Sequence, residues 1–356
     1  MALALPVVWS DRHRLHDPGG EVWIGLRIPG TELPERAERI RATLAEAGAR
    51  LVAAREQPDD AVLAVHDRAL TEYLAAAWRD WEATGLPVDP GQDRVVPYVF
   101  AHPSLAADRA PAVPTAPSAR AGYFAYDTMT LIGPGTWEAA RAAVDVAVTA
   151  ADLVLAGAPA AYACCRPPGH HVTRTSFGGS CYLNNSAAAA AHLLAGLGAP
   201  VAVIDVDAHH GNGTQAVFYD RADVLVGSVH VDPGAGWFPH FLGFEDETGA
   251  GAGEGANRNS TLAPGTGDDG WVPAVEALAA WAAEARALVV ALGVDAAGGD
   301  PESPLNVTPA GFRAAGRALG ALGLPTVAVQ EGGYDLDAIG ELVHEFLTGL
   351  EEGASG

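Results

Sequence analysis

The sequence has 356 residues, of which 49% are hydrophobic and 18% are charged, a composition typical of a folded globular protein rather than a disordered chain. Acidic residues outnumber basic residues by 44 to 21, giving a formal net charge of −23, and this charge repels phosphate backbones, so we expect no nucleic-acid partner. All 21 basic residues are arginine, which excludes a Schiff-base lysine and a P-loop lysine. A solvated acidic surface that keeps the protein soluble explains the net charge as a whole.

The N-terminal segment Met-Ala-Leu-Ala-Leu-Pro-Val-Val-Trp lacks a basic n-region and is too short for a signal peptide or a membrane span. It predicts a first buried strand in a cytoplasmic protein that has no membrane partner. The three cysteines, Cys164, Cys165 and Cys181, are odd in number and two of them are adjacent. This spacing argues against a disulfide framework.

Short apolar runs rich in Val, Ile and Leu then alternate with alanine-rich stretches of helical length. The runs, each of which predicts a buried strand, are residues 161–164, 201–205, 224–229, 288–292 and 326–329. The predicted helices are residues 136–156, 185–195, 272–287 and 309–322. This alternation predicts an α/β fold in which helices sandwich a parallel sheet, formed by residues 1–356 as a single domain. Ligands of such sheets bind beyond the carboxyl ends of the strands, where we expect the active site.

Two long segments show no clear hydrophobic period. Residues 85–120 are proline-rich, and we interpret them as a loop insertion, because a loop of that length in a compact domain usually has a function or is disordered. Residues 243–270 contain Gly-Ala-Gly-Ala-Gly-Glu-Gly, which is similar to a dinucleotide-binding fingerprint. That fingerprint requires a preceding strand, whereas acidic residues 245–247 precede the glycines here, so we discount it.

Residues 203–213 read Val-Ile-Asp-Val-Asp-Ala-His-His-Gly-Asn-Gly. If the chain stays extended past the strand end, Asp205, Asp207 and His209 point to the same side. Asp295 closes the next apolar strand in Leu-Gly-Val-Asp and supplies a third metal ligand beside Asp207 and His209. Carboxylate oxygens and an imidazole nitrogen suit Zn2+, with Fe2+ or Co2+ as alternatives, and three protein ligands leave a position open for catalysis. For any single aspartate, capping a helix is the competing explanation.

Two further motifs follow predicted strands. Residues 165–171, Cys-Arg-Pro-Pro-Gly-His-His, place His170 and His171 behind a rigid turn, where they can act as a base and an acid. Residues 330–334, Gln-Glu-Gly-Gly-Tyr, let the backbone bend tightly and present Tyr334 as a donor to an oxyanion. Taken alone, a histidine pair is common on surfaces, and such a tyrosine is more often part of the core.

Together these residues resemble the histone deacetylase and acetylpolyamine amidohydrolase family of the arginase-deacetylase superfamily, and the resemblance extends over about residues 7–350. Its hallmarks here are Arg166-Pro-Pro-Gly-His-His, Asp205-x-Asp-x-His-His-Gly-Asn-Gly-Thr-Gln, Gly293-Val-Asp and Glu331-Gly-Gly-Tyr. Stretches such as Pro134-Gly-Thr-Trp-Glu-Ala-Ala are most similar to the bacterial acetylpolyamine amidohydrolase branch. The resemblance implies an arginase/deacetylase-like fold.

The resemblance also implies roles for individual residues. It makes Asp207, His209 and Asp295 the zinc ligands. It implies that Asp205 orients His170, that His171 is the general base and then the acid, and that Tyr334 polarises the acetyl carbonyl. Asn212 stands where many protein-directed members have an aspartate beside the second histidine, as it does in the amidohydrolase branch, and this exchange lowers the expected basicity of His171. A structural potassium ion is implied at the side chains and backbone carbonyls of Asp205, Asp207, His209, Ser228 and Val229.

The rim of the implied acyl tunnel departs from the family pattern. Gly179 and Ser180 face Phe238 across the tunnel by this resemblance, and Ser180 replaces an aromatic wall, which implies a wider tunnel. Ser118 replaces an acidic residue of the bacterial polyamine enzymes, which weakens a polyamine assignment. Glu302 lies seven residues after Asp295, as a glutamate does in polyamine-selective relatives, and favours a charged amine. An ordinary solvated loop glutamate is the competing explanation.

Our leading hypothesis is a zinc-dependent hydrolase that removes acetyl groups from small N-acetylated amines, acetylpolyamines first, and releases acetate. The alternative is a protein acetyl-lysine deacetylase or a deacetylase of a specialised metabolite. A non-catalytic acyl-ligand binder would be expected to lack a zinc ligand or Tyr334, and none is missing. By the same resemblance, residues 85–120 help form a homodimer.

Overall fold

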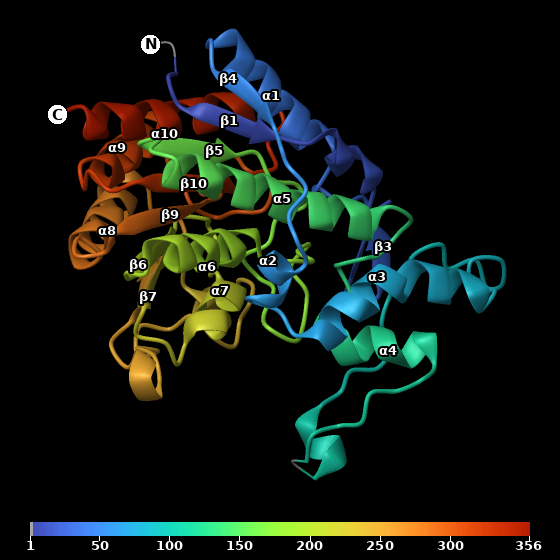
Figure 1. Cartoon of the computed structure of the whole chain (residues 1–356). Helices are drawn as coiled ribbons and strands as arrows, with labels where there is room; N and C mark the ends of the chain where they lie inside the picture. The colour runs from blue at the N-terminus through green and yellow to red at the C-terminus, as the bar shows by residue number, and fades with distance from the viewer. Residues whose placement is uncertain (1–2, 108) are drawn as a thin grey trace.

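The computed structural model describes residues 3–107 and 109–356, and an eight-stranded parallel sheet runs through its centre (Figure 1). The strand order is β4-β1-β5-β10-β9-β6-β7-β8. The strands are β1 (Pro6–Trp9), β4 (Arg50–Ala53), β5 (Ala160–Ala163), β6 (Val201–Asp205), β7 (Val224–Val231), β8 (Asn257–Leu262), β9 (Ala287–Leu292) and β10 (Thr326–Gln330). An antiparallel hairpin of β2 (Glu21–Trp23) and β3 (Leu26–Ile28) lies outside this sheet.

Helices cover both faces of the sheet (Figure 1). They are α1 (Glu35–Glu46), α2 (Asp60–Leu63), α3 (Arg68–Ala83), α4 (Pro117–Phe124), α5 (Thr136–Leu155), α6 (Asn185–Leu197), α7 (Asn212–Phe218), α8 (Asp268–Trp281), α9 (Pro309–Gly320) and α10 (Ile339–Ala354). Helices α5 and α6 belong to one hydrophobic core, and α1, α8, α9 and α10 belong to the other. In the described part of the chain, no helix combines the length and the hydrophobicity that a membrane span requires.

The alternation of side chains along a strand produces these two cores. Along β6, Val201 and Val203 pack on the side of α5 and α6, whereas Ala202 and Ile204 pack on the side of α8 to α10. All five residues of the strand are buried, as the continuous apolar run predicts. The predicted parallel sheet sandwiched by helices is therefore confirmed.

The expectation that residues 243–270 are irregular is wrong, whereas the loop insertion at residues 85–120 stays a prediction. Residues 243–270 contain strand β8, whose sequence is Asn-Arg-Asn-Ser-Thr-Leu. This strand was not predicted because it lies at the edge of the sheet and most of its residues are polar. Residues 85–120 contain a 3-10 turn at Pro103–Ala106 and the start of α4, although residue 108 lies outside the described residues. The segment between α3 and α4 extends away from the sheet (Figure 1).

Candidate active site

Three potential metal ligands meet at the carboxyl ends of two neighbouring strands. Asp207 and His209 follow β6, Asp295 follows β9, and these strands pair in register. The His209 Nδ1 lies 3.3 Å from Asp207 Oδ1 and 3.0 Å from Asp295 Oδ2. Strand β6 ends at Asp205 and the chain bends at residues 207–209, so the expected extended course past the strand is wrong. The bend nevertheless brings the predicted ligands together.

The donor set fits a divalent cation. One ligand atom from each of Asp207, His209 and Asp295 lies within 4.8 Å of the others. The carboxylates of Asp207 and Asp295 are at most 1% exposed, and the His209 Nδ1 lies between them. Two buried anions at this distance repel each other unless a positive charge compensates them. A cation bound by two carboxylates and one imidazole supplies that charge and leaves a coordination position open.

The tandem histidines have environments that separate their proton affinities. The Nδ1 of His170 is 2.9 Å from Asp205 Oδ2, and the Nδ1 of His171 is 2.6 Å from Asn212 Oδ1. Burial alone lowers the pKa of His170, but the carboxylates of Asp205 and Asp207 outweigh it and raise the pKa to about 10. Burial lowers the pKa of His171 well below its ordinary value, and the charges of His170 and His209 lower it further. His171 is thus the neutral imidazole of the pair, able to accept a proton.

Tyr334 belongs to a loop that is held on several sides. The N–H of Gly332 donates to Asp207 Oδ2 at 2.8 Å, and the N–H of Tyr334 donates to Asp300 Oδ2 at 2.7 Å. The guanidinium of Arg36 donates to the carbonyls of Glu331 and Gly333 and lies 4.5 Å from the centre of the Tyr334 ring. Burial raises the pKa of Tyr334 well above its ordinary value. The phenol therefore stays protonated and can donate a hydrogen bond.

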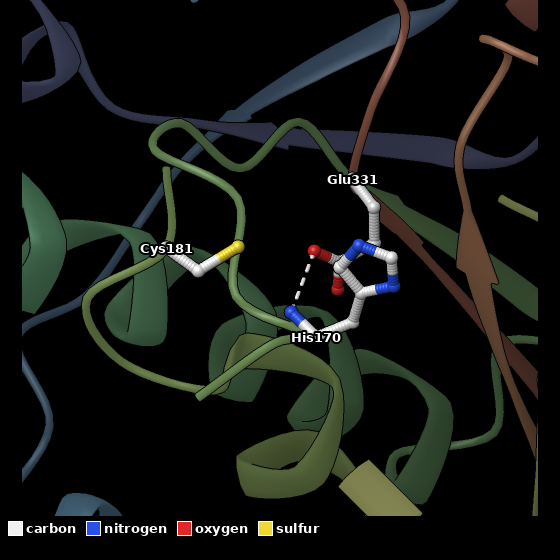
Figure 2. A group of neighbouring side chains, drawn as sticks. All are labelled: His170, Cys181 and Glu331. Atoms are coloured by element: carbon white, nitrogen blue, oxygen red, sulfur yellow. Dashed lines mark hydrogen bonds between the residues drawn. The ribbon is translucent and has the colours of Figure 1, made fainter. Parts of the chain in front are cut away.

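Glu331, just before this loop, joins it to the tandem histidines. Its Oε2 accepts from the N–H groups of Gly169 and His170 at 2.7 and 3.1 Å, and its Oε1 accepts from the Ser186 hydroxyl at 2.6 Å. Figure 2 shows this carboxylate joined by a hydrogen bond to the backbone nitrogen of His170, with Cys181 nearby. His170, Cys181 and Glu331 are spaced closely enough for a metal. Both Glu331 oxygens and the His170 Nδ1 already have hydrogen-bond partners, however. Burial also raises the pKa of the Cys181 thiol well above its ordinary value, which disfavours the thiolate that a metal requires.

A pocket of about 80 Å3 opens onto this centre. Its lining contains the predicted residues His171, Gly179, Ser180, His209, Phe238, Glu302 and Tyr334, together with Glu21, Thr31 and Met129. The Phe238 ring lies 4.8 Å from that of His171 at an interplanar angle of 80°. Gly179 has a φ of +60°, and a Cβ there would come within 2.3 Å of His171 Cδ2, so this wall requires glycine.

Two carboxylates lie at this pocket. The Glu302 Oε1 accepts from the Thr31 hydroxyl at 2.8 Å. Burial and the neighbouring charge of Glu302 raise the pKa of Glu21 to about 7. Sequence reasoning missed Glu21 because it lies in the short hairpin β2–β3, whose second strand is exposed and carries no strong pattern. Thr31 and Glu302 are 271 residues apart in the sequence and come into contact only in the folded protein.

Other predicted positions lie outside this pocket. Asp205 and Ser228 face each other across the β6–β7 pairing, and the Ser228 hydroxyl lies 2.8 Å from His230 Nδ1. Val229 follows in β7 and is buried. Ser118 lies in α4 and is not part of the pocket lining.

The chain is similar to known proteins over most of its length. A family model described as the histone deacetylase domain matches residues 31–350. The acetylpolyamine amidohydrolase of Mycoplana ramosa is 40% identical over 97% of this chain and 99% of its own. Acetylpolyamine amidohydrolase 1 of Pseudomonas aeruginosa is 40% identical over 98% of this chain and 99% of its own. A crystal structure of the acetylpolyamine aminohydrolase from Burkholderia pseudomallei superimposes with a TM-score of 0.91 at 36% identity, covering 98% of both chains.

A match over most of the chain, at this identity and with this fold, identifies the family and its chemistry. In this fold two buried carboxylates, an imidazole, a histidine pair and a phenol follow the carboxyl ends of four neighbouring strands, β5, β10, β9 and β6. The chain belongs to the histone deacetylase family of metal-dependent hydrolases that cleave amide bonds.

Proposed function

We propose that the protein hydrolyses the acetamide of small N-acetylated amines, acetylpolyamines first, and releases acetate. The observation that carries this proposal is the presence of two carboxylates, Glu21 and Glu302, in the same pocket as Tyr334 and His209. An acetyl group at the metal ligands leaves the far end of a short substrate near these carboxylates, which attract an ammonium group. The names of the relatives above support the same substrate class.

The reaction divides among the residues of the site. A divalent cation held by Asp207, His209 and Asp295 supplies Lewis-acid chemistry toward the carbonyl and water. His171 accepts the proton of the attacking water and passes it to the departing amine. His170, paired with Asp205, keeps a positive charge beside it. The Tyr334 phenol donates to the developing oxyanion.

The proposal extends to the ions. Zn2+ suits two carboxylates and one imidazole, with Fe2+ or Co2+ as alternatives. A structural K+ is proposed at Asp205 and Ser228, which face each other in the sheet, together with the backbone carbonyls of Asp207, His209 and Val229. Elemental analysis of the purified protein tests both assignments.

A larger substrate is the second candidate, either an acetyl-lysine protein or an acetylated specialised metabolite. The supporting observation is a cavity of about 590 Å3 lined by aromatic side chains, including Trp23, Phe100 and Phe241. Met129 and Phe238 line both this cavity and the catalytic pocket. An apolar substituent on the amine of the substrate can therefore bind in the larger cavity next to the catalytic pocket.

We further propose that residues 1–356 form a single catalytic domain in a cytoplasmic homodimer. Exposed apolar side chains gather on the hairpin β2–β3 and the proline-rich segment, among them Trp23, Ile24, Tyr98 and Leu105. Exposed apolar groups of this kind are typical of a protein–protein interface. Light scattering that gives only monomer at micromolar concentration contradicts the homodimer.

Steady-state kinetics test the substrate. The efficiencies kcat/KM for acetylputrescine, acetylspermidine and acetylcadaverine are compared with those for acetyl-lysine peptides. We expect the polyamines to be the better substrates. A higher efficiency on peptides than on every polyamine would refute the small-amine assignment and favour the second candidate.

A further inference from the structure

Asp300 links two loops of the site through one carboxylate. Its Oδ2 accepts from the N–H groups of Tyr334 and Asp335 at 2.7 and 3.1 Å. Its Oδ1 accepts from the N–H of Glu302 at 3.0 Å. The first two donors lie in the loop after β10, and the third lies in the loop after β9. Asp300 therefore contacts the backbone of both Tyr334 and Glu302.

Burying the carboxylate of Asp300 costs free energy. Asp300 is only 5% exposed, and burial raises its pKa while the N–H donors of Tyr334, Glu302 and Asp335 lower it. A buried carboxylate is tolerated where hydrogen-bond donors replace the lost water. Three backbone donors do so here, and they fix the carboxylate relative to both loops.

The two linked residues face the same pocket. Tyr334 and Glu302 both line the catalytic pocket, and strands β9 and β10, which lead into their loops, are adjacent in the sheet. The side chain of Glu302 is also held by the Thr31 hydroxyl. The distance between the phenol and the rim carboxylate thus depends on the backbone geometry that Asp300 holds.

We propose that Asp300 is a positioning residue that couples turnover to amine selectivity, by setting Tyr334 and Glu302 at a fixed separation across the pocket. This inference rests on the proposed hydrolysis of acetylated amines. It differs from that proposal because Asp300 touches neither the substrate nor the metal ligands and acts through two other residues. A substitution of Asp300 should therefore change both kcat and the preference for a cationic over a neutral substrate.

The test uses Asp300→Asn with two substrates of equal length. N-Acetylputrescine carries an ammonium, and N-pentylacetamide carries a methyl group in its place. Asparagine has the same shape as aspartate, but its amide NH2 cannot accept, so one of the two loops loses its anchor. We expect kcat on both substrates to fall by about 10-fold to 100-fold, as for a small misplacement of catalytic groups. We expect the ratio of kcat/KM for the cationic over the neutral substrate to fall by about 3-fold to 5-fold.

Two comparisons separate positioning from a general structural role. In a Glu302→Gln background, Asp300→Asn should still lower kcat but no longer change the substrate ratio, because the charge of Glu302, the rim carboxylate whose backbone Asp300 holds, is already gone. Asp268→Asn is the matched control, since the Asp268 carboxylate also accepts from a backbone N–H and a hydroxyl, both of Thr308, but is not part of the pocket lining. This control should leave kcat and the ratio unchanged.

An unchanged substrate ratio in Asp300→Asn, or an unchanged kcat, overturns the coupling. If Asp300→Asn does not fold, Asp300→Glu replaces it, because the longer side chain keeps the charge and shifts the carboxylate, and the same two changes are expected. The proposed function is tested by the wild-type rate on N-acetylputrescine, whereas the coupling is tested by the changes in the variants. The two proposals can therefore fail independently. Metal content and circular dichroism of each variant accompany the kinetics.

Discussion

Replacement of Glu331 should separate the hydrogen bonds of this carboxylate from its charge. Glu331→Leu leaves the N–H groups of Gly169 and His170 without their acceptor in a fully buried site. Each unsatisfied buried donor costs about 1–3 kcal/mol, so the two N–H groups cost about 2–6 kcal/mol, and loss of the acceptor of the buried Ser186 hydroxyl adds to this. Glu331→Gln keeps one acceptor oxygen for both N–H groups, and its NH2 can donate to Ser186, so we expect a loss within about 1 kcal/mol.

Urea unfolding followed by circular dichroism measures the free energy of unfolding, and steady-state assays measure kcat. Because the two N–H groups belong to the turn that carries His170 and His171, kcat should fall in Glu331→Leu and largely return in Glu331→Gln. Glu351→Leu is the matched control, since Glu351 accepts from the N–H groups of Ala4 and Leu5 at the opposite end of the sheet. It should reduce stability slightly and leave kcat unchanged. Equal kcat or equal stability in the two Glu331 variants would refute this reasoning.

Three further outcomes are expected. Tyr334→Phe should retain its metal and lose about 100-fold to 1,000-fold in kcat, as for removal of one oxyanion donor; an unaltered rate removes the phenol from the mechanism. Treatment with a chelator should abolish turnover, and Zn2+ or Co2+ should restore it, whereas an Asp295→Asn variant should not be restored, as metal analysis will show. Because the pKa of Glu21 is raised to about 7, its carboxyl is mainly neutral below that pH and charged above it. The KM of N-acetylputrescine relative to N-pentylacetamide should therefore fall between about pH 6 and pH 8, and a ratio that stays flat, or that changes equally in Glu21→Gln, contradicts this role.

The central elements could be predicted because their signals are local. The run 201–205 is apolar at every position up to Asp205 and forms a buried strand, and the alanine-rich stretch from residue 185 forms α6, capped at its start by the Asn184 side chain. Strands β4 and β8 escaped prediction because they lie at the two edges of the sheet. An edge strand has one unpaired side and need not be apolar, so its sequence resembles that of a loop.

The side chains that form the centre could be predicted from the sequence. Asp207, His209 and Asp295 follow strand ends, and the rule that parallel strands end at one edge brings such residues together without knowledge of side-chain positions. The course of the loops after the strands could not be predicted and was seen only in the structure. The bend after Asp205 brings the imidazole of His209 between the two carboxylates.

Only the tertiary structure decided what surrounds that centre. Glu21 joins Glu302 at the rim, and Asp300 joins Glu302 to Tyr334, through contacts between segments far apart in the chain. No local pattern encodes such contacts, because they depend on how separate loops pack at one end of the sheet. The sequence therefore determined the fold class and the chemical groups of the centre, whereas packing determined the distances and charges around the substrate.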